Sequence, residues 1–199
     1  MNKNFNEAIR ERRSIYAIGK ESPISDERIR KVVEDVVKHV PSAFNSQTTR
    51  VLVLLGESHD KLWDITMEAL RKIVPANDFA STEGKINSFK AGYGTVLFFE
   101  EFAIVESLQK QFELYKDNFP VWASQTSGMM QFAVWTAFSA EGLGASLQHY
   151  TELIDADVRK EFNIPSSWKM MAQMPFGNIL APAGEKAYSP IEDRVKVLK

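Results

Sequence analysis

Two adjacent arginines and a serine, Arg12, Arg13 and Ser14, follow a short amphipathic segment near the N-terminus. Two guanidinium groups and a hydroxyl offer several hydrogen-bond donors at one place, which suits a dianionic phosphate. The alternative for so short a motif is a solvated basic helix end, because cations also favour the negative end of the helix dipole. The residue types therefore predict either a phosphate site or a plain helix terminus.

A second segment, residues 41–47, is small and polar and lies between an expected helix and an expected strand. Asn45 and Gln47 each carry an amide donor and an amide acceptor, which suits the edge of a flat heterocycle with alternating N–H and C=O groups. The ring of Phe44 is able to stack on such a heterocycle or on a substrate. The alternative is a loop that ends a helix and is rich in turn-forming residues.

A third segment, residues 142–150, begins at glycines that end an apolar stretch and continues as an expected strand edge. Backbone amides at such a transition can point into a cleft, although a helix C-cap that leads into a strand has the same pattern. His149, within this segment, has two interpretations: a structural hydrogen bond at a strand end, or tuning of a neighbouring ring.

Several other chemistries lack the residues that they require. The chain has no cysteine, which excludes disulfides, cysteine-ligated zinc, iron–sulfur clusters and thiol nucleophiles. The three histidines, His39, His59 and His149, lack the HExxH spacing of a zinc site, so we expect no metal. The GxxxxGK[ST] phosphate loop and the G-x-S-x-G nucleophile motif are also missing.

Charge and hydropathy limit the partners and the location. The 199 residues carry a formal net charge of −2, which argues against a sequence-independent nucleic-acid binder. No apolar run approaches about 18 residues, so we expect no membrane span. The polar N-terminus lacks the apolar centre of a secretory signal. We therefore expect a cytoplasmic protein that has neither a nucleic acid nor a membrane as its partner.

Hydrophobic periodicity predicts the helices and strands that position these segments. Helices are expected over residues 4–13, 25–40, 58–73, 102–115, 128–143 and 155–162, with Ser25, Ser58 and Asp155 as N-caps and Pro41 as a stop. Strands are expected over residues 51–55, 95–99, 145–150 and 169–177, and residues 192–198 have a strand-like composition.

The order of these elements predicts an α+β or mixed α/β fold, in which helices flank a sheet of four or five strands. At this length, residues 1–199 are expected to form a single domain. Residues 128–143 are apolar almost all round, which is typical of a helix that is buried on every side. Because one chain of this size cannot easily surround such a helix, we expect a homodimer to supply the missing cover.

In this order, the three segments resemble the FMN-dependent nitroreductase family. The usual pattern of that family is R-R-S, then P-S-x-x-N-x-Q-P-W, then G-[LI]-G before a strand, and a basic C-terminal tail. The matching segments here are residues 12–14, 41–47, 142–144 and 186–194. The tail is similar to that of a short subgroup, which includes fungal fatty-acid-repression proteins and a copper-induced nitroreductase of lactic-acid bacteria. Tyr16 stands where many members have a basic residue, and Thr48-Thr49 replaces the usual Pro-Trp.

The resemblance implies an α+β fold with a central, mostly antiparallel sheet, and an entwined homodimer that binds FMN at its interface. The implied contacts to FMN fall into three groups. The phosphate and ribityl groups are held by Arg12, Arg13, Ser14, Lys186 and Arg194. The partner subunit contributes Pro41, Ser42, Ala43 and Asn45, with Gln47 at the ring edge, and the isoalloxazine lies along Leu147, Gln148 and His149. Phe44, Tyr150 and Trp122 are expected to form the walls of a flat substrate site, with the alternative that each ring is simply a core residue.

The implied activity is the transfer of hydride from NADH or NADPH to a small electron-poor acceptor, by a ping-pong reaction through the flavin N5 atom. Nitroaromatics, quinones and flavin itself satisfy the same geometry. The flavin carries this chemistry, so no side chain is nominated as a general acid or base. Two other functions remain open: a non-catalytic flavin-binding redox sensor, and an interaction module without a cofactor.

Overall fold

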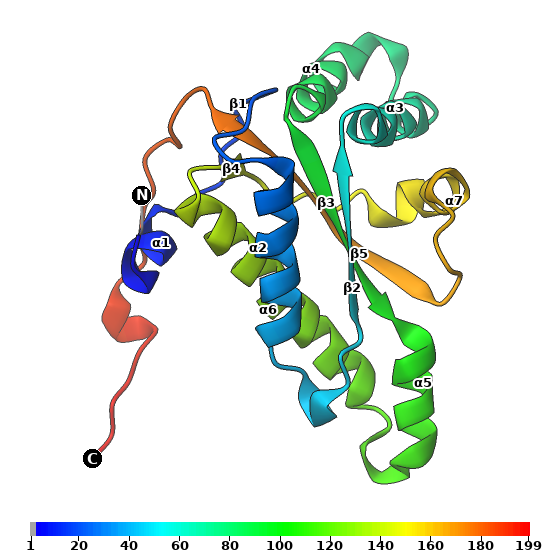
Figure 1. Cartoon of the computed structure of the whole chain (residues 1–199), viewed down its shortest axis with the longest axis vertical. Helices are drawn as coiled ribbons and strands as arrows, with labels where there is room; N and C mark the ends of the chain where they lie inside the picture. The colour runs from blue at the N-terminus through cyan, green and yellow to red at the C-terminus, as the bar shows by residue number, and fades with distance from the viewer. Residues whose placement is uncertain (1–2) are drawn as a thin grey trace.

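The fold is built around one antiparallel sheet (Figure 1). The structure is a computed structural model that describes residues 3–199, so residues 1 and 2 of the expected domain lie outside the described part. The described strands are β1 (Ile18–Gly19), β2 (Thr49–Leu55), β3 (Gly94–Glu101), β4 (Gly144–Ala145) and β5 (Trp168–Ile179). Their order is β1-β5-β3-β2, and β4 also pairs with β5. All of these pairs are antiparallel, which confirms the predicted class of fold.

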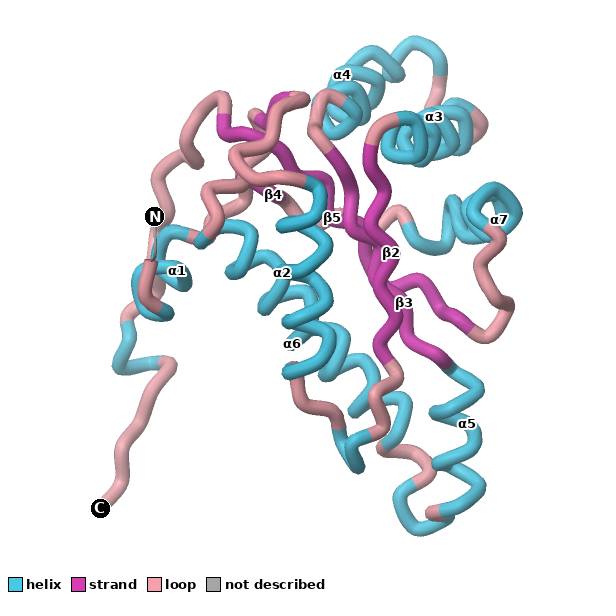
Figure 2. Tube along the Cα trace, in the orientation of Figure 1, coloured by secondary structure: helices cyan, strands magenta, loops and turns pink. Residues whose placement is uncertain are grey.

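Helices cover both faces of the sheet (Figure 2). The α-helices within residues 3–199 are α1 (Phe5–Glu11), α2 (Asp26–His39), α3 (Glu57–Arg71), α4 (Phe79–Lys90), α5 (Phe102–Gln111), α6 (Phe119–Ala140) and α7 (Thr151–Phe162). The helices α2 and α6 lie on one face, and α3, α4 and α7 lie on the other. None of these helices has the length and hydrophobicity needed to cross a bilayer.

The central strand β3 joins the two hydrophobic cores because its side chains alternate between the faces. Val96 and Phe98 pack in the core beneath α2 and α6. Leu97 and Phe99 pack in the opposite core, with residues of α3, α4 and α7. All four side chains are fully buried, so this strand reads in the sequence as a continuous apolar run.

Helix starts follow the predicted capping chemistry at some positions and not at others. The Ser25 side chain accepts a hydrogen bond from the Arg28 N–H, which confirms it as the N-cap of α2. The predicted cap at Ser58 is wrong, because α3 begins one residue earlier and Gly56 is its N-cap, with a φ of 54° that favours glycine. The predicted cap at Asp155 is also wrong: this residue lies inside α7, where it binds Arg159.

The helix predicted over residues 128–143 begins much earlier, at Phe119. Polar residues in its first half interrupt the apolar pattern, and a proline in the first turn is compatible with a helix start. One side of α6 is open in the single chain, where Met129 is 43% exposed and Phe132 is 41% exposed. The single chain therefore leaves one side of this helix uncovered, as expected, and the homodimer that would cover it stays a prediction.

The strands near the ends of the chain differ most from expectation. Of the strand expected over residues 145–150, only Ala145 lies in a strand, the two-residue β4, and an isolated bridge between Gln148 and Gln173 follows. The tail expected as a strand is instead extended coil around a short 3-10 turn at Ile191–Asp193. The short strand β1 was not expected at all, and it lies so close to β5 that a Cβ at Gly177 would meet the Gly19 carbonyl oxygen at 2.1 Å.

Candidate functional site

The segment that carries Arg12, Arg13 and Ser14 runs along the edge of the sheet and borders a cavity of about 490 Å³. Helix α1 ends at Glu11, and Arg12 has extended backbone dihedrals, so the chain leaves the helix here. Ser14 then forms a parallel bridge with Ala145 of β4, and the Ile15 N–H donates to the Ala145 carbonyl at 2.9 Å. Main-chain pairing with the sheet therefore fixes the position of the arginine motif.

Arg12 lies on an aromatic surface at this cavity. Its Cζ atom is 4.3 Å from the centre of the Trp135 ring and 5.9 Å from that of Phe132, both on α6. The Nε atom of Arg12 is buried and has no hydrogen-bond partner within residues 3–199. Burial lowers the pKa of Arg12, and the neighbouring charge of Arg13 lowers it further. Such a desolvated cation with an unused donor is complementary to an anion.

The other side of the cavity comes from the C-terminal tail, which places Lys186 near the arginine motif. A guanidinium nitrogen of Arg13 donates to the Gly184 carbonyl at 2.7 Å, and this contact joins the two segments. The lining within the described chain includes three basic side chains and one acidic side chain, that of Glu185. The predicted phosphate residues are thus brought together in an electropositive cavity, except for Arg194, which is exposed and does not line it.

Ser42, Asn45 and Gln47 line a second, separate cavity of about 210 Å³, between the end of α2 and α6. The Gln47 N–H donates to the Ser42 hydroxyl at 2.9 Å, which closes the loop on itself. Phe44, Asn45 and Gln47 all have positive φ values, of 57°, 50° and 49°. Non-glycine residues in the left-handed region cluster at functional sites, because surrounding structure must hold them there. Pro41 and Ala43 flank these residues in the same loop.

Glu100 lies at the end of β3, next to this loop, and sequence reasoning missed it. The side chain is fully buried, and its Oε1 accepts a hydrogen bond from the Thr49 hydroxyl at 2.6 Å. Its Oε2 atom has no partner in the part of the chain that the structure describes. Burial raises the pKa of Glu100, although Thr48, Thr49 and Arg50 act in the opposite direction. The available signal was a carboxylate at the end of an otherwise apolar strand.

Replacing Glu100 with Gln is expected to stabilise the protein more at neutral pH than in acid. Burial raises the pKa of Glu100 above its ordinary value of 4.5 in the folded protein. In the wild type, the contribution of the protonated carboxyl to the free energy of unfolding is therefore complete below that pH. This contribution is lost as pH rises through the folded pKa and the buried group ionises. The amide does not ionise and keeps the bond from Thr49. Urea denaturation of both proteins at about pH 5 and pH 8 measures the difference. If the two proteins differed in free energy of unfolding by the same amount at both pH values, the raised pKa of Glu100 would be contradicted.

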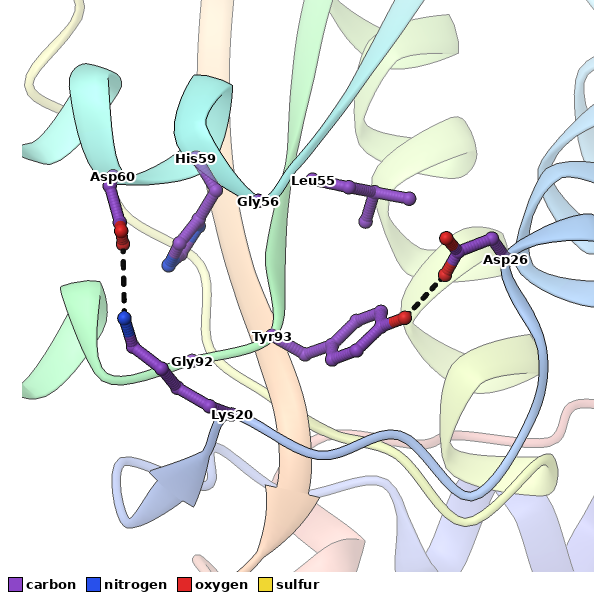
Figure 3. Close-up of a pocket in the computed structure, with 8 residues that line it drawn as sticks. All are labelled: Lys20, Asp26, Leu55, Gly56, His59, Asp60, Gly92 and Tyr93. Carbon is purple, nitrogen blue, oxygen red and sulfur yellow. Dashed lines mark hydrogen bonds and ion pairs between the residues drawn. The ribbon is translucent and has the colours of Figure 1, made fainter.

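A third cavity, of about 260 Å³, lies at the other end of the sheet, where α3 begins (Figure 3). Polar side chains that line it are bonded to one another: Lys20 binds Asp60 at 3.4 Å, and the Tyr93 hydroxyl donates to Asp26. His59 is buried at its wall, with Nδ1 2.8 Å from the Thr95 hydroxyl oxygen. None of these residues belongs to the predicted flavin contacts, and their mutual pairing is typical of a structural cluster.

Acid is expected to destabilise the protein through His59, because burial lowers the pKa of this imidazole in the folded state. As pH falls below about 6.5, the unfolded chain binds the proton first, and the free energy of unfolding decreases. His59→Gln is expected to flatten this dependence between about pH 7.5 and pH 5.5. His39→Gln, at an exposed position of α2, serves as the control. Urea denaturation at several pH values in this range measures the free energy of unfolding of the wild type and of both variants. The prediction would be contradicted if this free energy changed with pH equally in all three proteins.

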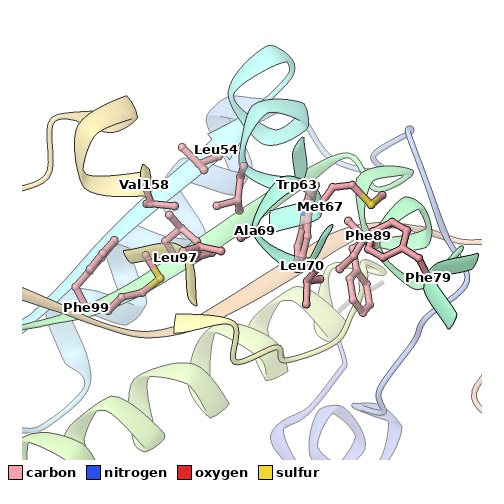
Figure 4. Close-up of a cluster of buried hydrophobic side chains, with 14 residues drawn as sticks. Leu54, Trp63, Met67, Ala69, Leu70, Phe79, Phe89, Leu97, Phe99 and Val158 are labelled. Atoms are coloured by element: carbon pink, nitrogen blue, oxygen red, sulfur yellow. The ribbon is translucent and has the colours of Figure 1, made fainter. Parts of the chain in front are cut away.

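Two of the three predicted substrate residues lie together in an aromatic group, and the third does not. Phe44 stacks on Trp122 of α6, with ring centres 5.8 Å apart, and the group also contains Phe112, Tyr115 and Phe119. Tyr150 packs instead on the opposite face of the sheet, against the core that contains Trp63 (Figure 4). A single chain therefore does not bring Tyr150 next to the other two rings.

The predicted ring contacts at residues 147–149 have mixed environments. The backbone of Gln148 pairs with Gln173 in both directions, at 2.7 and 2.9 Å, and its buried side chain donates to the Ser146 hydroxyl. Leu147 is half-buried and His149 is exposed. The main chain of Gln148 and one donor of its side chain are thus bonded within the subunit, and His149 has the exposed side chain of the three.

Comparisons with known proteins extend over most of the chain. A sequence model described as the nitroreductase family matches residues 9–178. Two relatives come from Saccharomyces cerevisiae: HBN1 is 40% identical over 179 residues, 89% of each chain, and the nitroreductase FRM2 is 31% identical over 188 residues, 93% of each chain. The nitroreductase CinD from Lactococcus lactis, solved in complex with chloramphenicol, is 46% identical with a TM-score of 0.90, over 98% of this chain and 100% of that chain. The same enzyme has been solved in complex with 4-nitrophenol, where the identity is 47% and the TM-score is 0.90.

Proposed function

Because this chain belongs to the nitroreductase family, an oxidoreductase family, we propose that it is an FMN-dependent enzyme that oxidises NADH or NADPH. The acceptor in this proposal is a small electron-poor aromatic compound. The observation that carries the proposal is the electropositive cavity at Arg12, Arg13 and Lys186. A phosphate monoester supplies the anion that such a cavity suits.

The residues of this cavity fit the phosphate of FMN. The unused buried donor of Arg12 and the guanidinium of Arg13 are positioned for charge-assisted bonds, and Ser14 adds a hydroxyl to the same lining. When bound, FMN would supply the redox chemistry, since it accepts hydride from a nicotinamide and passes two electrons to an acceptor. The role of the protein is to hold this group and to orient the substrates beside it.

The proposed site needs a second copy of the chain. Within one subunit, the arginine motif and the amides of Asn45 and Gln47 line different cavities. A homodimer would allow the loop of one subunit to meet the cavity of the other. Apolar side chains exposed on α6 and on the tail support this assembly: Val121, Met129, Phe132, Tyr188, Val195, Val197 and Leu198.

The proposed acceptors are nitroaromatics and quinones. The stacked pair of Phe44 and Trp122 offers a flat apolar surface, and Phe44 is half exposed. The related CinD has been solved with chloramphenicol and with 4-nitrophenol, which both contain a nitrobenzene ring. A planar ring stacked on this surface would be excluded from water while it receives electrons.

Absorption spectroscopy of the purified protein tests the proposal. We expect a flavin spectrum that is bleached by NADH or NADPH without oxygen and that returns when a nitroaromatic or menadione is added. Sedimentation of the same sample should give the mass of a dimer. Reduction without return of the spectrum would favour the flavin-binding redox sensor instead. A colourless protein that does not bind added FMN would reject both functions.

A further inference from the structure

The aromatic surface beneath Arg12 carries an inference that rests on the proposed function. We propose that Trp135 is a positioning residue, whose ring holds the Arg12 guanidinium ready to bind the phosphate of FMN. Trp135 lies on α6, far in sequence from the arginine motif, and no residue pattern nominates it. Through this contact, it would contribute to selecting a phosphorylated flavin over one without a phosphate.

The contact leaves the hydrogen-bonding edge of Arg12 available. The guanidinium carbon lies 4.3 Å from the centre of the Trp135 ring, which is the distance of a close cation–π contact. Phe132 stands one helical turn before Trp135, so the two rings are neighbours on the surface of α6. A guanidinium whose face lies on a ring still has its N–H groups directed outward in its own plane.

The two arginines are held in different ways. Arg13 is anchored by its hydrogen bond to the Gly184 carbonyl. The Nε atom of Arg12 has no hydrogen-bond partner within residues 3–199. The guanidinium group lies instead on the rings of Phe132 and Trp135. Its pKa is lowered by burial and by Arg13, so this cation gains from any contact that offsets desolvation. An aromatic face does this without neutralising the charge that a phosphate requires.

Preorganisation is the expected benefit. Arginine has many rotamers, and restricting them before the ligand arrives lowers the entropy cost of binding. Without the ring, Arg12 would be free to extend into solvent, away from the cavity. We assign Arg12 to the phosphate and not to the ribityl chain, because a desolvated cation with an unused donor favours a dianion over neutral hydroxyls. The effect of Trp135 therefore depends on the phosphate. A ligand that lacks the phosphate should therefore be indifferent to Trp135.

Comparing FMN with riboflavin tests this dependence. Full-length protein is equilibrated with each flavin, and the free flavin is measured after ultrafiltration. Trp135→Leu is expected to weaken FMN binding roughly tenfold, the loss expected for a desolvated cation–π contact, and to leave riboflavin binding unchanged. Trp135→Phe keeps a smaller ring and should give an intermediate loss. In an Arg12→Ala background, Trp135→Leu should have no further effect on FMN.

Two controls separate this role from a structural one. Gln125→Ala, at an exposed polar position of the same helix, should leave the preference for FMN intact. Circular dichroism and sedimentation show whether each variant retains its fold and assembly. Equal losses for FMN and riboflavin in Trp135→Leu and Trp135→Phe would overturn the inference, and so would an unchanged FMN affinity. Wild-type protein that binds no FMN would overturn the proposed function itself.

Discussion

A variant with alanine at both Arg12 and Arg13 is expected to purify without flavin. In the proposed function, each arginine forms charge-assisted hydrogen bonds to the phosphate of FMN, and each such bond contributes about 1.5–3 kcal/mol. Loss of one bond from each residue would weaken FMN binding by roughly 10²- to 10⁴-fold. Lys186 remains in the cavity but offers a single point charge. The ratio of flavin absorbance to protein absorbance in the purified sample measures this loss.

Arg10→Ala is the matched control for this double variant. Arg10 belongs to the same short helix, its Nε donates to the Asn6 carbonyl, and it does not line the cavity. The control changes the same residue type by the same truncation and should keep its flavin. A double variant that is as yellow as the wild type would contradict the assignment of Arg12 and Arg13 to the phosphate.

The largest expected effect on stability comes from Phe176→Ala. Phe176 lies on β5, is fully buried, and its ring centre is 4.8 Å from that of Phe138 on α6. Truncating a buried phenylalanine removes apolar contacts and leaves a cavity, which costs about 3–5 kcal/mol. We expect the urea midpoint to fall by a corresponding amount while the slope of the transition is unchanged. Because Phe176 joins α6 to the sheet, flavin affinity should fall with stability.

Ile73→Ala provides the comparison for this stability measurement. Ile73 follows α3 and is 63% exposed, so its truncation should change the free energy of unfolding by less than about 0.5 kcal/mol. If Phe176→Ala were as mild as Ile73→Ala, the ring could not be the link between α6 and the sheet. A fall in flavin affinity for Phe176→Ala without a fall in stability would point to a direct role in binding.

Local patterns predicted the elements that have a regular apolar period or a continuous apolar run. The helix α2 has apolar residues at helical spacing, a serine cap and a proline after its end, and all three signals are local. The strand β3 has a short apolar run, which predicts burial on both faces. The start of α6 was missed because its exposed side carries polar residues in the first half, and β1 was missed because two residues have no periodicity.

The sequence predicted only the part of the candidate site that depends on local motifs. The order of the motifs led to the nitroreductase family, which the family match confirms, and Arg12 and Lys186 do line one cavity. The contacts of Trp135 and Glu100 with residues far along the chain leave no local pattern. Tyr150 was assigned to the wall of a flat substrate site, whereas its ring packs against Trp63 in the core that α3 and α7 cover. Packing against residues far along the chain determines where Trp135, Glu100 and Tyr150 lie.

The place of β5 in the sheet has a consequence for biosynthesis. This strand is the last in the described chain, yet it pairs with β1, β3 and β4. Until the ribosome has released residues 168–179, the nascent polypeptide can pair only β2 with β3, and one edge of β3 stays without a neighbour. Completion of the sheet is therefore expected to wait for this strand, and a premature stop codon before it should yield an aggregation-prone fragment.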